Sequence, residues 1–186
     1  MERREGLRPP PGTRIANVPA GMEGRAAVEC PGGLDFANPD FAITFRMTSI
    51  HDGESRYYHS SNRGRDWQGP CNLPNFGQPG IAARTDYLIS GGKEMLVMLT
   101  AAKSNRREGL VIAVRARDGG KLWHMLSFIG PEPEDFAIVP SSVRVGPGDI
   151  VTAIRRRRWI DVYRPVDDRE PWRFRSRSAK GTRARK

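Results

Sequence analysis

The sequence predicts an all-β protein assembled from a repeated unit of four short strands. One eight-residue frame occurs three times, at residues 60–67, 116–123 and 165–172, with Asp or Asn at its third position and Trp at its eighth. The three tryptophans recur at intervals of about 50 residues, a period typical of propellers and other repeat arrays. No stretch shows a sustained helical spacing of apolar residues, so helices are not expected.

Each copy of the frame lies between short runs rich in β-branched and aromatic residues, and the runs recur in the same order. The first unit, 25–73, predicts strands at 25–30, 41–50, 55–61 and 66–73. The second unit, 82–129, predicts strands at 82–90, 94–102, 109–116 and 121–129. The third unit, 141–176, predicts strands at 141–145, 149–156, 159–164 and 171–176. Gly-Gly and Pro-Gly pairs separate many of these runs, as turns between strands require.

The recurring frame has a physical role as a tight turn. The side chain of its third residue can bond the backbone two residues further on and close the turn, and its fifth position favours Gly because positive φ is needed there. Its Trp enters the outgoing strand and buries a large apolar ring. The structural positions are Asn62, Gly64 and Trp67 in the first copy, Asp118, Gly120 and Trp123 in the second, and Asp167 and Trp172 in the third.

The frame resembles the Asp-box, S-x-D-x-G-x-x-W, of the sialidase or BNR-repeat superfamily, whose fold is a six-bladed β-propeller. Beyond the frame, the stretches 73–88, 99–109, 128–145 and 152–164 look like bacterial exo-α-sialidase or neuraminidase-like proteins. The resemblance covers about residues 25–176. It implies about three four-stranded antiparallel blades of a sialidase-like propeller and a glycosidase that hydrolyses a terminal sialic acid or a related acidic sugar.

This chain departs from the Asp-box pattern at several positions. Asn62 replaces Asp in the first copy, and Ala116 opens the second copy in place of Ser. The third copy has Pro165 and Arg169 where Ser and Gly are expected. The third turn must therefore satisfy its backbone in another way.

The first strand of each propeller blade lines the central channel, which places Arg84, Asp86 and Tyr87 of the second unit and Arg144 of the third beside it. Sialidases hold the substrate carboxylate with an arginine cluster, and a guanidinium binds a planar carboxylate through two hydrogen bonds. The resemblance therefore implies that Arg84 and Arg144 bind the substrate. Arg84 and Asp86 alternate along one strand and share a face, either as a channel site or as an ion pair within the wall.

Sialidase chemistry uses a Tyr nucleophile activated by Glu, with an Asp as acid/base. The resemblance implies Asp86 as the acid/base and Tyr87 as a substrate-binding residue, although Tyr87 points away from Asp86 in a regular strand. Glu134 lies in the loop 130–136 and either contributes a carboxylate at the channel mouth or belongs to a solvated connection. No complete catalytic set is placed on this sequence, and a non-catalytic module that binds a glycan or a protein is the alternative function.

Three blades are half of a six-bladed ring, and an open half-ring leaves apolar faces uncovered. The chain is therefore expected to be a fragment of a longer protein, a half-ring that pairs with a second copy as a homodimer, or a poorly stable domain. The fragment interpretation is favoured.

Most of the net charge of +10 lies in the C-terminal residues 151–186. The run 173–186 holds seven basic residues and no acidic residue, and residues 177–186 are expected to be a basic tail. It is interpreted as a polyanion-binding arm, a solvated tail or the product of a truncation, and nucleic acid is not the expected partner. The four arginines 155–158 are expected to lie at a solvated hairpin.

The remaining features bound the function further. Cys30 and Cys71 permit one disulfide or two free thiols, and no spacing of Cys and His fits a metal site. Neither a cofactor nor a metal is expected. Residues 1–24 are charged and proline-rich, which predicts a flexible lead-in without a signal peptide. No run is long enough to cross a membrane. Because no signal peptide is visible, a cytoplasmic location is expected. The partner that the resemblance implies is a carbohydrate.

Overall fold

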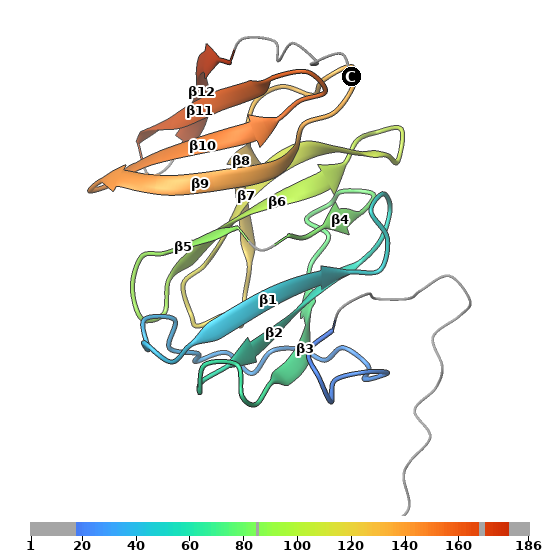
Figure 1. Cartoon of the computed structure of the whole chain (residues 1–186), viewed down its shortest axis with the longest axis vertical. Helices are drawn as coiled ribbons and strands as arrows, with labels where there is room; N and C mark the ends of the chain where they lie inside the picture. The colour runs from blue at the N-terminus through green and yellow to red at the C-terminus, as the bar shows by residue number, and fades with distance from the viewer. Residues whose placement is uncertain (1–17, 85, 168–169, 179–186) are drawn as a thin grey trace, which may run out of the picture.

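The computed structural model describes residues 18–84, 86–167 and 170–178, which form three antiparallel sheets without a helix among them. The sheets are sheet 1 (β1–β3), sheet 2 (β4–β8) and sheet 3 (β9–β12), and they lie one above another along the long axis (Figure 1). The described residues include no helix long and apolar enough to span a bilayer. The all-β prediction is confirmed for this part of the chain.

Sheet 3 matches its predicted four-stranded unit. Its strands follow the chain from one edge to the other, with each neighbouring pair antiparallel. Alternate residues of the second strand are buried, because successive side chains point to opposite faces and one face packs on sheet 2. The strands are β9 (Ile138–Gly146), β10 (Asp149–Arg155), β11 (Ile160–Asp167) and β12 (Glu170–Arg177).

Sheet 2 is the central layer, and its strand β6 is buried at every position because sheets cover both of its faces. The predicted first strand, 82–90, is instead two short strands, β4 and β5, which both pair with β6. Between them, Ala83, Arg84 and Asp86 belong to no strand, although the carbonyl of Asp86 still accepts from the amide of Met98 in β6. The strands are β4 (Ile81–Ala82), β5 (Tyr87–Ile89), β6 (Met95–Ala102), β7 (Glu108–Ala116) and β8 (His124–Phe128).

Sheet 1 has three strands, β1 (Ala42–Met47), β2 (Ser55–Ser60) and β3 (Gln68–Leu73), in that order. The prediction of a fourth strand at 25–30 is wrong. That segment forms one isolated parallel bridge, Val28 to Cys71, at the β3 edge rather than at the β1 edge. A short apolar run does not say which edge it joins, and Pro31 and Gly32 follow it at once.

Two cores hold the three sheets together. Odd-numbered residues of β6, such as Val97 and Leu99, enter the core between sheets 1 and 2, whereas Leu96 and Met98 enter the core between sheets 2 and 3. The first core includes three aromatic rings in mutual contact, those of Phe45, Tyr57 and Trp123, and the ring of Trp123 meets the other two in edge geometry. The period-two alternation of one strand therefore serves both interfaces.

Two of the three recurring frames form the predicted turns. In the first, the Oδ1 atom of Asn62 accepts from the amide of Asp66 at 2.9 Å, and Gly64 has a φ of +76°. In the second, Oδ1 of Asp118 accepts from the amides of Lys121 and Leu122, and Gly120 has a φ of +86°. The positive φ at position five is confirmed in both turns. The side chain at position three closes each turn as predicted, but it accepts from amides three or four residues further on rather than two.

The third frame differs from the other two. Asp167 is the last residue of β11 and pairs with Glu170 in β12, so the third position of this frame belongs to a strand. Residues 168–169, which include the substituted position Arg169, lie outside the described part. Trp172 nevertheless packs against the core between sheets 2 and 3, as its place in the frame predicts.

The C-terminal arginines are more ordered than the sequence suggests. Arg177 belongs to β12 and donates to Asp161, so the tail does not begin at residue 177, and residues 179–186 lie outside the described part. The hairpin at 155–158 is confirmed, but Arg156 is buried rather than solvated. Its guanidinium donates to Asp161 at 2.9 Å and to the hydroxyl of Tyr163 at 3.0 Å.

Candidate ligand site between sheets 2 and 3

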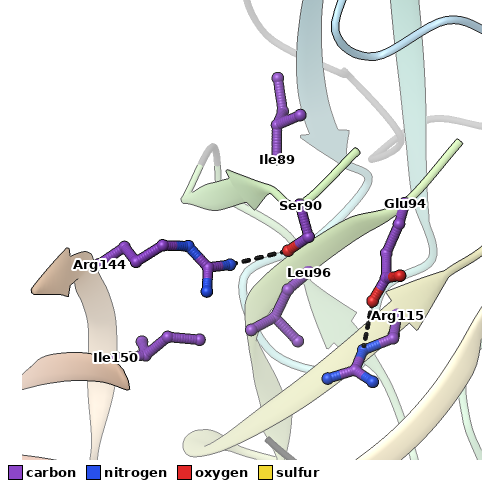
Figure 2. A pocket seen from close by; sticks show the side chains of 7 residues that line it. All are labelled: Ile89, Ser90, Glu94, Leu96, Arg115, Arg144 and Ile150. Carbon is purple, nitrogen blue, oxygen red and sulfur yellow. Dashed lines mark hydrogen bonds and ion pairs between the residues drawn. The ribbon is translucent and has the colours of Figure 1, made fainter. Parts of the chain in front are cut away.

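A polar hollow of about 500 Å³ opens where the end of β5 faces β9. Its position follows from the fold, because the first strands of sheets 2 and 3 lie beside each other and leave the rim of their shared core open to solvent. Figure 2 shows the side chains around it. The lining residues are Ile89, Ser90, Glu94, Leu96, Arg115, Arg144 and Ile150.

Arg144, one of the two predicted carboxylate-binding residues, extends from β9 across this hollow. Its Nη2 atom donates to Oγ of Ser90 at 2.7 Å (Figure 2). The side chain is exposed, and the serine hydroxyl is a neutral partner. The guanidinium therefore keeps its full charge and most of its donors for a ligand.

Arg115 supplies a second guanidinium from β7. Its side chain is 12% exposed, and its Nε atom lies 3.5 Å from Oε1 of Glu94. Glu94 also lies 3.7 Å from Arg117, so one carboxylate is shared between two arginines. The lining contains two positively charged side chains, Arg115 and Arg144, and one negatively charged side chain, Glu94. This excess of positive charge favours an anionic ligand.

Sequence reasoning did not select Ser90, Glu94 or Arg115. One of them carried a signal: Arg115 interrupts the apolar run of β7 at a position that shares a face with Val111 and Ala113, which lie in the core between sheets 2 and 3. A charged residue on the buried face of a strand is uncommon unless it is paired. Ser90 and Glu94 flank the Gly91-Gly92 turn, and nothing in the turn pattern distinguishes them.

Asp86, the predicted acid/base, lies in the gap between β4 and β5 and faces sheet 3. Its Oδ1 accepts from the amide of Ser142 at 3.2 Å, and its Oδ2 accepts from the hydroxyl of Ser142 at 3.0 Å. That hydroxyl is also 2.8 Å from Oγ1 of Thr152. Burial raises the pKa of Asp86 above its usual range, and the hydrogen bonds from Ser142 offset part of the rise.

Arg84 lies away from both Asp86 and Arg144. Its guanidinium forms an ion pair with Glu108, which pairs with Ala102 at the far end of β6. Arg115 pairs with Leu96, six residues back along β6, so the two arginine sites are about 20 Å apart along the strand. The expected sharing of a face by Arg84 and Asp86 is wrong, because the strand is broken between them.

Glu134 also lies at the far end of β6. Its side chain is exposed, and its carbonyl accepts from Nζ of the buried Lys103 at 2.9 Å. The same ammonium donates to the carbonyls of Pro133 and Asp135, so Lys103 organises this loop through its backbone. The structure therefore places Glu134 in a solvated connection that Lys103 holds in shape, apart from the hollow.

Tyr87 faces the opposite way from Asp86, as predicted. It packs against the core between sheets 1 and 2, whereas the next residue, Leu88, packs against the core between sheets 2 and 3. Of the predicted site residues, the hollow therefore contains Arg144 alone. In the described part of the chain, no three His, Cys, Asp or Glu side chains gather as metal ligands would.

The burial of Asp86 predicts a pH-dependent stability. Because its pKa is raised in the folded state, the folded chain binds the proton more tightly than the unfolded chain, and ionisation of Asp86 destabilises the fold as pH rises. Asp86→Asn keeps the shape without the charge. We therefore expect the variant to gain stability relative to wild type as pH rises through and above the usual pKa range of an aspartate, measured by urea unfolding.

The exposed carboxylate Asp52 provides the control, Asp52→Asn, for a general effect of charge. If the unfolding free energies of wild type and Asp86→Asn change with pH in the same way, burial does not penalise the charged form of Asp86.

Comparisons with known proteins bear on the fold of this chain. No family model matches the chain, and no curated protein matches it. Among solved structures, a mutant of NanB sialidase from Streptococcus pneumoniae is similar, with a TM-score of 0.54 and 21% sequence identity. The likeness covers 70% of this chain and 20% of the sialidase chain. This chain therefore has a sialidase-like, β-propeller-like arrangement of sheets and spans a minor part of that protein's length.

Proposed function

We propose that this chain is the acidic-sugar-binding part of a sialidase-like glycoside hydrolase. The observation that carries the proposal is the hollow between sheets 2 and 3, where Arg144 and Arg115 approach one polar space of about 500 Å³. The sialidase-like arrangement of sheets and the recurring turns resembling Asp-boxes support the same class. The ligand is a sialic acid or a related sugar that bears a carboxylate.

The lining chemistry fits such a ligand. A carboxylate accepts two parallel hydrogen bonds from a guanidinium. Arg144 can make both when the ligand replaces its one hydrogen bond to the hydroxyl of Ser90. Ser90 and Glu94 then remain as partners for sugar hydroxyls. The apolar side chains of Ile89 and Leu96 cover the C–H faces of a ring. A neutral sugar lacks the charged partner for Arg144 and binds more weakly.

Hydrolysis of a terminal sialic acid requires more than this hollow. Both carboxylate oxygens of Asp86 are bound to Ser142, and Tyr87 packs in the other core. Glu94, the carboxylate of the hollow, is shared by two arginines. We therefore expect the 186-residue chain to bind the sugar without turning it over. Release of sugar from a fluorogenic sialoside by the purified chain would show instead that its catalytic groups are complete.

Binding is tested by titrating the chain with sialic acid and, separately, with a neutral hexose. Arg144→Ala should weaken binding of sialic acid by about 10-fold to 100-fold, since a hydrogen bond to a charged group contributes about 1.5–3 kcal/mol. Arg106→Ala removes an exposed arginine at the far end of β6 and should leave the affinity unchanged. Equal affinities of wild type and Arg144→Ala, or equal binding of both sugars, would overturn the proposal.

A further inference from the structure

Cys30 and Cys71 meet in the core between sheets 1 and 2, outside the proposed sugar site. They come from segments 41 residues apart in sequence. Both thiols are free, with exposed fractions of 6% and 2%. Cys30 lies in the segment that joins the β3 edge through the single bridge of Val28 to Cys71, and both cysteine side chains belong to the same buried cluster. Sheet pairing and the shared core therefore bring the two sulfurs close together.

From this juxtaposition, we infer that Cys30 and Cys71 form an oxidisable pair, which closes to an intramolecular disulfide when the folded chain meets a small disulfide oxidant such as oxidised glutathione. The two sulfurs must close to a bond length of about 2.05 Å. A single bridge holds the Cys30 segment to β3, which permits this shift.

The two thiols have different roles in this reaction. The interaction with Cys71 lowers the pKa of Cys30 despite the opposing effect of burial, which favours the thiolate at Cys30. Cys30 also lies in the segment that a single bridge holds to β3, so it meets an oxidant before Cys71 does. The same interaction between the two thiols, with burial, raises the pKa of Cys71. Cys30 is therefore the attacking sulfur, and Cys71 is the resolving one.

The steps balance as thiol–disulfide exchange. The Cys30 thiolate attacks one sulfur of oxidised glutathione, forms a mixed disulfide and releases one glutathione thiolate. Cys71 then loses its proton and attacks the Cys30 sulfur, which releases the second glutathione. Two protein thiols are oxidised, and one glutathione disulfide is reduced to two thiols.

The oxidant reaches the buried pair through local opening of the Cys30 segment. The amide of Val28 donates to Pro70, and the carbonyl of Val28 accepts from Asn72, which amounts to one bridge rather than a ladder. An element held by so few backbone bonds opens at a lower free energy than the sheets around it. Before the segment opens, the amide of Gly32 donates to the Cys30 sulfur at 3.4 Å and stabilises its thiolate.

Closure would secure the connection between sheets 1 and 2. Beyond Cys30 the chain binds two loops of sheet 2, through the amide of Leu34 to Gly119 at 3.1 Å and the amide of Phe36 to Gly92 at 2.7 Å. A disulfide would fasten the start of this connection to β3. Because the bond closes a long loop in the unfolded chain, the melting temperature should rise by roughly 5 °C or more.

The test exposes the full 186-residue chain to oxidised glutathione under native conditions, quenches with acid, alkylates the remaining thiols and maps the peptides. We expect one linked peptide that joins Cys30 to Cys71, a monomer on a non-reducing gel, and a raised melting temperature that dithiothreitol reverses. Cys71→Ser should stop at a single glutathione adduct on Cys30.

Three results would overturn the inference. The first is a native chain whose two cysteines are both alkylated after a treatment that does oxidise the urea-unfolded chain. The others are glutathione adducts on both cysteines and disulfides between chains. If Cys71→Ser fails to fold, the peptide map of the wild-type chain still decides the matter, since it requires no variant.

Discussion

Asp161→Ala should destabilise sheet 3 by about 3–5 kcal/mol, because it removes one partner of a buried ion pair and leaves the other charge uncompensated. The Asp161 side chain is 1% exposed and accepts from Arg156 at 2.9 Å and from Arg177 at 2.7 Å. Arg156 is itself 8% exposed and has no other carboxylate among its described partners. Urea unfolding at neutral pH measures the loss.

Two controls separate the buried pair from a general charge effect. Asp135→Ala removes a carboxylate that is 58% exposed and 3.6 Å from Arg157, and it should cost less than about 0.5 kcal/mol. Arg177→Ala removes the more exposed of the two arginines and should cost less than Asp161→Ala. A loss below about 1 kcal/mol for Asp161→Ala would contradict the buried geometry.

The same residue predicts a loss of stability in acid. Burial alone would raise the pKa of Asp161, but the hydrogen bonds from Arg177 and Arg156 outweigh it and lower the pKa below the usual value. A group whose pKa is lowered by folding stabilises the fold above its unfolded pKa and loses that effect as pH falls through the folded pKa. The difference between wild type and Asp161→Ala should therefore shrink in acid.

Trp123→Ala should cost about 3–5 kcal/mol, the usual penalty for removing a large aromatic side chain from a core. Trp123 belongs to the turn of sheet 2, yet its ring contacts sheet 1. Its centroid lies 5.8 Å from that of Tyr57 and 6.4 Å from that of Phe45, both in edge geometry. Its loss opens a cavity at the interface between two sheets rather than within one.

The matched control is Trp67→Ala at the same position of the first turn. Trp67 is half-buried and covers Gly64 of its own turn, so its loss should cost less than that of Trp123. Thermal or urea unfolding of the two variants gives the comparison. Equal losses would mean that the tryptophans stabilise their own turns and that the contact between sheets contributes little.

The recurring frame predicted more of the fold than any other feature of the sequence. Asn62 and Asp118 can each close a turn by local hydrogen bonds, and Gly64 and Gly120 permit the positive φ, so these turns depend on residues close together in the chain. Strand positions on either side follow from alternation of apolar residues. The β2–β3 hairpin of sheet 1 and the β7–β8 hairpin of sheet 2 were therefore predictable from local chemistry.

Features that depend on distant partners were harder to predict. The segment 25–30 is apolar enough for a strand, but its place at the β3 edge depends on contacts with Cys71 and its neighbours. Arg156 looks solvated in sequence because only the fold brings Asp161 and Tyr163 to it. Arg84 and Asp86 have the right spacing to share a face, and the break between β4 and β5 separates them.

The proposed site shows the same division. Arg144 was selected because a resemblance placed it on the first strand of its unit, and it does line the hollow. Its companions come from sheet 2, where Arg115 lies on β7 and Glu94 directly precedes β6. Their meeting depends on the register of β6 with β7, which pairs Leu96 with Arg115. Sequence spacing does not specify that register.

The most direct measurement for the proposed site is a map of backbone amide shifts during titration of the isotope-labelled chain with sialic acid. We predict shifts that centre on Ser90, Glu94 and Arg144, the residues around the hollow of Figure 2, with smaller shifts for the same concentration of a neutral hexose. Shifts confined to the far end of β6 near Arg84 and Glu108, or no saturable shifts, would contradict an acidic-sugar site between sheets 2 and 3.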